Sequence, residues 1–196
     1  MSESLLTILP PDAMPTTVDR VKEQMRITGD DDSQDGMIER LIGAAVGMVE
    51  RDTRRVLVTR TMRLALDDFP RKPPGVVHLP AVPVASIVSV KYLHAETGIQ
   101  QTLSAASYRL DAAHEPGRLE PAHGETWPAV RKMLGSVTVD FVAGAAADEL
   151  PEDLVHAIIM IAAHLYENAE ATTTLDLKAV PMAVETILAR YRRPTL

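Results

Sequence analysis

Hydrophobic residues recur along the chain with two different spacings, and each spacing predicts a different kind of element. Apolar positions three or four residues apart predict amphipathic helices in four segments. These segments are residues 18–26, 34–55, 151–168 and 181–191. Between residues 61 and 143 the spacing is two, as in Met62, Leu64 and Leu66, and prolines interrupt the runs. This alternation predicts several short antiparallel strands in a small sandwich or barrel.

Together these elements predict an α+β fold, in which a mainly helical core of about four helices carries an inserted small antiparallel β domain and extended termini. Residues 1–60 are expected to hold the N-terminal arm and two helices, residues 61–147 the β domain, and residues 148–196 the last helices and a tail. Threonines and alanine at 171–174 predict a linker before the last helix.

The first 16 residues are expected to form an extended arm, because three prolines in so short a stretch disfavour regular structure. The arm also carries apolar residues that are unusual in a free tail, which predicts docking on this chain or on a neighbouring copy. The candidate contact residues are Leu5, Leu6, Ile8 and Leu9. The alternative is an ordinary frayed terminus.

Composition narrows the class of protein. Aromatic residues make up only 4% of the chain, so the core rests on aliphatic side chains. The net charge of −7 argues against a protein that coats DNA, which needs a basic surface to displace counterions. The absence of cysteine excludes disulfides, thiolate metal sites and cysteine nucleophiles. The apolar run at 154–166 is too short to span a membrane and the N-terminus has no signal-peptide pattern, so production in a cytosol is expected.

No residue cluster predicts a catalytic, cofactor-binding or metal site. His156 and His164 lie on similar faces of one helix, but zinc needs three or four converging ligands and the spacing demands no such convergence. No serine lies in a Gly-x-Ser-x-Gly context, and no glycine-rich phosphate loop follows a strand. Two alternatives stay open: a small β-rich hydrolase, and an accessory domain that binds nucleic acid through Arg190, Arg192 and Arg193.

Two isolated features have both a structural and a binding interpretation. The only tryptophan, Trp127, precedes Pro128, and anchoring of a loop is favoured over a contact with a partner. The basic end at Arg192 and Arg193 complements the dipole of a helix C-terminus and also suits an acidic partner surface.

Short motifs such as Leu79-Pro80-x-x-Pro83-Val84 and Gly124-x-x-Trp127-Pro128 follow one another in a recognisable order. The segments that carry this order are residues 21–27, 41–50, 53–57, 69–70, 79–92, 124–128, 137–144, 151–154 and 164–168. With them the chain resembles the head–tail connector (adaptor) proteins of long-tailed bacteriophages and of related particles such as gene transfer agents. It departs from that family at Arg54, where glycine is common, and at Ala169, where arginine is common.

The resemblance implies a structural virion protein without catalysis, cofactor or membrane. About twelve copies of such an adaptor form a ring under the portal and join it to a tail-side stopper or tail terminator protein. The ring leaves a channel through which DNA passes without sequence-specific binding. The implied location is the head–tail junction of a virion or phage-like particle, after synthesis in the bacterial cytoplasm. By analogy, residues 172–196 are expected to reach the portal. The candidate contact residues are Leu175, Leu177, Ile187, Leu188, Tyr191, Arg192 and Arg193.

Overall fold

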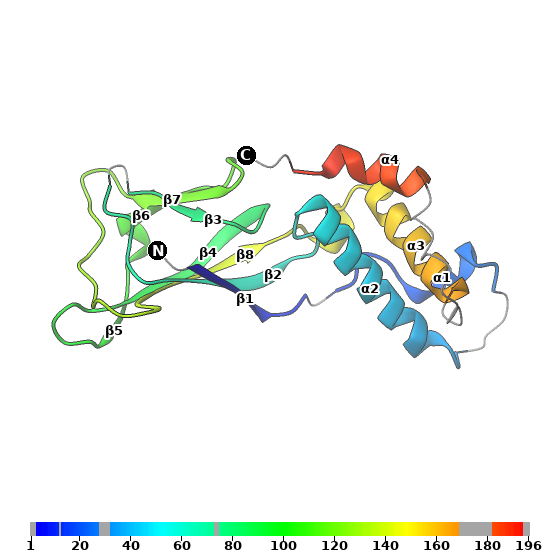
Figure 1. The fold of residues 1–196 in the computed structure, drawn as a ribbon, viewed down its shortest axis with the longest axis horizontal. Helices are drawn as coiled ribbons and strands as arrows, with labels where there is room; N and C mark the ends of the chain where they lie inside the picture. Colours follow the sequence, from blue (N-terminus) through cyan, green and yellow to red (C-terminus); the bar gives the residue numbers. More distant parts are fainter. Residues whose placement is uncertain (1–2, 12, 28–31, 73–74, 169–181, 194–196) are drawn as a thin grey trace, which may run out of the picture. The chain divides into compact units, whose positions relative to one another are not determined.

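The structure, a computed structural model, describes residues 3–11, 13–27, 32–72, 75–168 and 182–193. The chain divides into two compact units, both drawn in Figure 1. The β unit comprises Met1–Asp12 and Thr59–Ala145, and the helical unit comprises Ala13–Val58 and Ala146–Leu196. Residues 1–12 of the N-terminal arm, which the expected boundaries grouped with the helices, cluster with the β unit, while residues 13–16 belong to the helical unit.

Five antiparallel strands form the main sheet of the β unit. Their order across the sheet is β1 (Glu3–Leu9), β2 (Arg60–Leu66), β8 (Val137–Ala143), β4 (Val84–Leu93) and β5 (Gln100–Thr102). β1 and β5 are thus its two edges (Figure 1). The order in the second antiparallel sheet is β3 (Val77–Leu79), β7 (Gly117–Pro121) and β6 (Tyr108–Asp111).

The core of the β unit forms on one face of the main sheet. The register places Leu64 of β2 opposite Val139 of β8, which in turn lies opposite Val90 of β4, and all three side chains are fully buried. β7 approaches this core closely, because a Cβ on Gly117 would lie 2.8 Å from Cγ2 of Val84 on β4. A larger residue than glycine would therefore force the two strands apart.

Trp127 anchors a loop of the β unit, as the sequence predicts. Its ring stacks on that of Phe69, with the centroids 4.5 Å apart and the planes nearly parallel. Its Nε1–H donates a hydrogen bond of 2.5 Å to the carbonyl oxygen of Gly75. The indole is buried with its one donor satisfied, which is the usual requirement for a buried tryptophan.

β1 is a strand that the sequence pattern missed. Residues Glu3–Leu9 pair with β2 in antiparallel register, with an irregularity between Thr7 and Leu9. The prolines that argued against regular structure begin only at Pro10, so every residue of β1 keeps its backbone N–H donor. The extended conformation was predicted, whereas the pairing with β2 was not.

Within the described residues, four helices form the helical unit. They are α1 (Val18–Gln24), α2 (Asp35–Thr53), α3 (Glu152–Glu167) and α4 (Met182–Tyr191). α3 contacts the other three (Figure 1). Its buried residues are Leu154, Val155, Ala157, Ile158, Ile159, Ile161, Ala162 and Ala163. The predicted α+β class is thus confirmed. The predicted linker at 171–174 lies outside the described residues.

Local signals set the helix ends. The side chain of Thr17 caps α1 by accepting a hydrogen bond of 3.4 Å from the N–H of Arg20. α2 ends where Arg54 takes a left-handed conformation with φ of +56°. Glycine adopts this conformation most easily, which explains why glycine suits this position in the resembling family. Among the described segments, no helix is long and apolar enough to cross a membrane.

Candidate functional site

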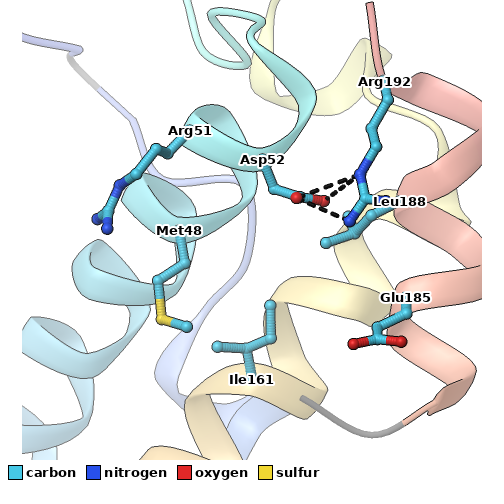
Figure 2. A pocket seen from close by; sticks show the side chains of 7 residues that line it. All are labelled: Met48, Arg51, Asp52, Ile161, Glu185, Leu188 and Arg192. Atoms are coloured by element: carbon cyan, nitrogen blue, oxygen red, sulfur yellow. Dashed lines mark hydrogen bonds and ion pairs between the residues drawn. The ribbon is translucent and has the colours of Figure 1, made fainter. Parts of the chain in front are cut away.

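The end of α4 is joined to α2 by an ion pair between Arg192 and Asp52. Arg192 Nη2 lies 2.8 Å from Asp52 Oδ1, and Arg192 Nε lies 3.0 Å from Asp52 Oδ2 (Figure 2). The hydrogen bond to Asp52, together with its negative charge, raises the pKa of Arg192. Because both side chains are partly exposed, the pair orients the chain more than it stabilises the fold.

The adjoining residue, Tyr191, is bonded through both its hydroxyl and its carbonyl. The hydroxyl donates to Asp153 Oδ1 at 2.7 Å, and this hydrogen bond raises the pKa of Tyr191 because ionisation would place two negative charges together. Arg55 Nε donates to the Tyr191 carbonyl oxygen at 3.1 Å. The N–H of Arg193 donates to the carbonyl oxygen of Thr53 at 3.1 Å. The last described residues are therefore tied to both α2 and α3.

The contacts of Tyr191, Arg192 and Arg193 with α2 and α3 are called the C-terminal anchor. A cavity of about 350 Å³, the C-terminal groove, lies beside this anchor (Figure 2). Its apolar lining comes from Met48 of α2, Ile161 of α3 and Leu188 of α4. The Asp52–Arg192 pair also lines it. Apolar surface bordered by charged groups offers contacts to a protein segment.

The candidate portal contacts fall into three groups. Leu175 and Leu177 lie outside the described residues. Leu188 is buried against the helical unit, while Ile187 is half-buried. Tyr191, Arg192 and Arg193 form the bonds to α2 and α3 described above. Their role in partner binding stays a prediction.

Asp52 and Asp153 are the residues of this anchor that the sequence did not point to. They lie 140 and 38 residues from the side chains that they bind. Their signal in the sequence is only an acidic residue on a helix, which is common on solvated faces. Nothing local pairs either aspartate with the end of the chain.

The N-terminal edge of the main sheet is the second candidate surface. The predicted inter-subunit residues all lie on β1, with exposed fractions between 37 and 60%. They are Leu5, Leu6, Ile8 and Leu9. Because β1 has a strand on one side only, alternate backbone N–H and carbonyl groups face away from the sheet. The edge thus offers both apolar side chains and a row of backbone hydrogen-bonding groups.

A polar network crosses the middle of the same sheet. Asp140 of β8 is only 5% exposed and accepts hydrogen bonds from Arg63 of β2 at 2.6 and 2.8 Å. Ser89 of β4 donates to the same carboxylate at 3.3 Å. The hydrogen bond from Arg63 is the main cause that holds the pKa of Asp140 below its ordinary value. The network joins three strands and explains a charged residue inside the apolar β8 pattern.

The histidines do not gather into a site. His156 is exposed on α3, and His164 Nδ1 lies 3.2 Å from Nδ2 of Asn168 one turn later. Across the part of the chain that the structure describes, no three His, Asp or Glu side chains lie close enough to hold a metal ion.

An exposed apolar strand edge and an apolar groove beside the end of α4 are typical of proteins that associate with other chains. A family model described as "Phage gp6-like head-tail connector protein" matches residues 15–109. The predicted resemblance to head–tail connector proteins is thereby confirmed. This match to structural connectors also agrees with the prediction of a protein that is not an enzyme.

Solved structures match nearly the whole chain. A chain in the "Neck of empty GTA particle computed with C6 symmetry" is 28% identical, with a TM-score of 0.78 and coverage of 98% of this chain and 97% of that one. A chain in the "Virion of native gene transfer agent (GTA) particle" is 26% identical, with a TM-score of 0.76 and coverage of 98% and 96%. A chain in the "Neck of native GTA particle computed with C12 symmetry" is 28% identical, with a TM-score of 0.68 and coverage of 100% and 97%. No curated protein sequence matches.

Proposed function

We propose that this chain forms a ring at the neck of a virion or phage-like particle and joins the capsid portal to the tail. The observation that carries the proposal is the match over 98% of the chain to a subunit of a gene transfer agent neck. The relatives were solved with C6 and C12 symmetry, which supports a ring of about twelve copies here. A tail-side stopper or terminator protein then binds the opposite face.

A ring of identical subunits needs two different surfaces that fit each other, because a head-to-tail contact closes by rotation. The apolar edge of β1 supplies one candidate surface, through Leu5, Leu6, Ile8 and Leu9. The C-terminal residues 172–196 supply the contact with the portal. Within this range, the bonds of Tyr191 to α3 and of Arg192 to α2 fix the position of the end of α4.

The acidic character of the chain suits a protein through which DNA passes. The net charge is −7, so twelve copies would carry a large negative charge. Affinity for phosphates depends on basic side chains that displace counterions. A ring of these subunits therefore binds DNA weakly and leaves a channel in which DNA slides.

The ring is tested by counting copies in assembled particles. Quantitative mass spectrometry against the portal, with imaging of the neck without imposed symmetry, is expected to give about twelve copies in one ring. A single copy in each particle, or a location away from the neck, would contradict the proposal.

Portal attachment is expected to be lost when residues 172–196 are removed, as measured by binding of the purified chain to purified portal.

A matched pair of variants separates the direct and indirect parts of this contact. Arg192→Ala and Asp52→Ala both remove the same internal ion pair, but only the first removes a candidate contact residue. Arg192→Ala is expected to weaken portal binding more. Equal weakening would mean that Arg192 acts only inside the chain.

A further inference from the structure

One end of the β unit displays an apolar tip with a basic flank. The exposed fractions are 65% for Ile99, 53% for Met133 and 81% for Leu134. Arg131 and Lys132 directly precede Met133 and Leu134, and the two basic side chains are also exposed. These five residues are called the tip. Both of its segments bond to neighbouring positions at the end of β4, because the Ile99 carbonyl oxygen accepts from the N–H of His94 and the N–H of Arg131 donates to the Leu93 carbonyl oxygen.

The loop that carries four of the tip residues, Arg131–Leu134, is held in one conformation by several hydrogen bonds. The buried hydroxyl of Ser136 is within 2.6 Å of the Arg131 carbonyl oxygen and 2.8 Å of that of Met133. The N–H of Gly135 donates to Asp67 Oδ1 at 3.1 Å, and the N–H of Arg131 donates to the Leu93 carbonyl oxygen at 2.9 Å. A loop held in this way loses little conformational entropy when it binds.

The two parts of the tip also contact each other. Gly98 has a φ of +69°, and a Cβ there would clash with the guanidinium of Arg131. The Arg131 side chain therefore lies over the turn that precedes Ile99. Large apolar residues on a fixed loop with an adjoining positive charge are typical of a docking element, since a solvated loop gains nothing from them.

The helical unit has a groove of matching chemistry. A cavity of about 360 Å³, the N-terminal groove, is lined by Met14, Leu150 and Val155 on its apolar side and by Asp148 and Glu152 on its acidic side. Four acidic residues fall within positions 148–153 around Leu150. Glu152 pairs at 3.0 Å with Arg20, which also lines the groove, so Asp148 is the second exposed carboxylate of the lining.

A second observation at this groove indicates a missing partner. Thr16 also lines the N-terminal groove, and this residue is only 6% exposed. Its Oγ1 has no hydrogen-bond partner in the described part of the chain. A buried hydroxyl without a partner is costly, and the cost is removed when a ligand supplies the missing group.

The helical unit is also more acidic than the β unit. Acidic residues outnumber basic ones by 17 to 11 in the helical unit and by only 10 to 9 in the β unit. A basic tip on the β unit is therefore electrostatically complementary to the helical unit of another copy.

We infer that the tip of one copy docks into the N-terminal groove of the next copy in the ring. Leu134 and Met133 cover the apolar wall at Met14, and Lys132 faces Asp148. Because tip and groove are different surfaces, the contact repeats head to tail around a closed ring. The inference rests on the proposed ring function and names a contact within it.

A cross-linking experiment in assembled particles tests this contact. The chain has no cysteine, so Leu134→Cys with Met14→Cys introduces the only two thiols. A short bis-maleimide is expected to join successive copies into a ladder on a denaturing gel. The matched control joins Leu134→Cys with Glu167→Cys, at the exposed far end of α3, about 20 Å from the groove at 1.5 Å per residue. The control is expected to stay monomeric.

Three results would overturn the inference: no ladder in particles that contain the ring, an equal ladder from the control, or cross-linking of position 134 to a different protein. Absence of the chain from the neck would instead overturn the proposed function. A charge exchange gives an independent measurement. Lys132→Glu is expected to lower the ladder yield roughly two- to five-fold, and adding Asp148→Lys is expected to restore it. Failure of the second change to restore the yield would also count against the contact.

Discussion

Replacement of Phe141 by alanine is expected to lower the free energy of unfolding of the β unit by about 3–5 kcal/mol. Phe141 is fully buried on β8, where the register places it opposite Met62 of β2 and Ile87 of β4. Removing the ring takes away its burial and leaves a cavity that the strands on both sides cannot fill. Urea unfolding followed by the fluorescence of Trp127, the only tryptophan and a residue of the β unit, measures the loss.

Val142 provides a matched control on the same strand. Its side chain lies on the opposite face of the sheet from Phe141 and is half-buried. Val142→Ala is expected to cost less than about 1.5 kcal/mol, since little packed volume is lost. Equal losses for the two variants would mean that the core does not lie on the face where the register places it.

The second large effect is expected from Asp140→Ala, at about 1–3 kcal/mol, which is below the range for a fully buried ion pair. The carboxylate accepts two hydrogen bonds from Arg63 and one from Ser89. Without it the Arg63 guanidinium loses its carboxylate partner at the middle of the sheet. The Arg63 side chain is 38% exposed, so water replaces part of the lost hydrogen bonding. Asp111→Ala is the matched control, because Asp111 binds Arg118 on the smaller sheet with more exposure, and little change is expected there.

The contribution of Asp140 to stability depends on pH with a definite sign. Its pKa in the folded chain is lowered, chiefly by the hydrogen bond from Arg63. The stabilisation is therefore fully present above the unfolded-state pKa of about 3.9 and is lost as the pH falls through the folded-state pKa. The difference between the wild type and Asp140→Ala is expected to be constant between about pH 7 and pH 5, and to shrink below about pH 4. Urea midpoints across this range measure it, and a difference that grew on acidification would contradict the network.

Local patterns explain why most elements were predicted correctly. β2 alternates between buried and less buried positions, and β8 does so except at the buried Asp140, with Leu64 and Val139 on the core face. α3 follows the predicted helical segment closely, because its apolar stripe and the proline before it are both local signals. In each case the residues that decide the conformation lie within the element itself.

What the sequence did not predict depends on contacts between distant segments. The pairing of β1 requires the edge of β2, some 60 residues away, and seven residues carry no sign of that neighbour. The Asp52–Arg192 pair joins residues 140 positions apart. The fixed conformation of the tip depends on Ser136 and Asp67, whose roles appear only when their strands are adjacent. The apolar content of the arm predicted docking, whereas its exposure on an edge strand came from the fold.

The division of the chain has a mechanical consequence. The backbone crosses from one unit to the other at residues 12–13, 58–59 and 145–146. Three covalent links therefore connect the two units. A protease that cuts one link leaves the units tethered by the remaining two, so a particle whose neck is built from such subunits tolerates a nick that would sever a single-linker design.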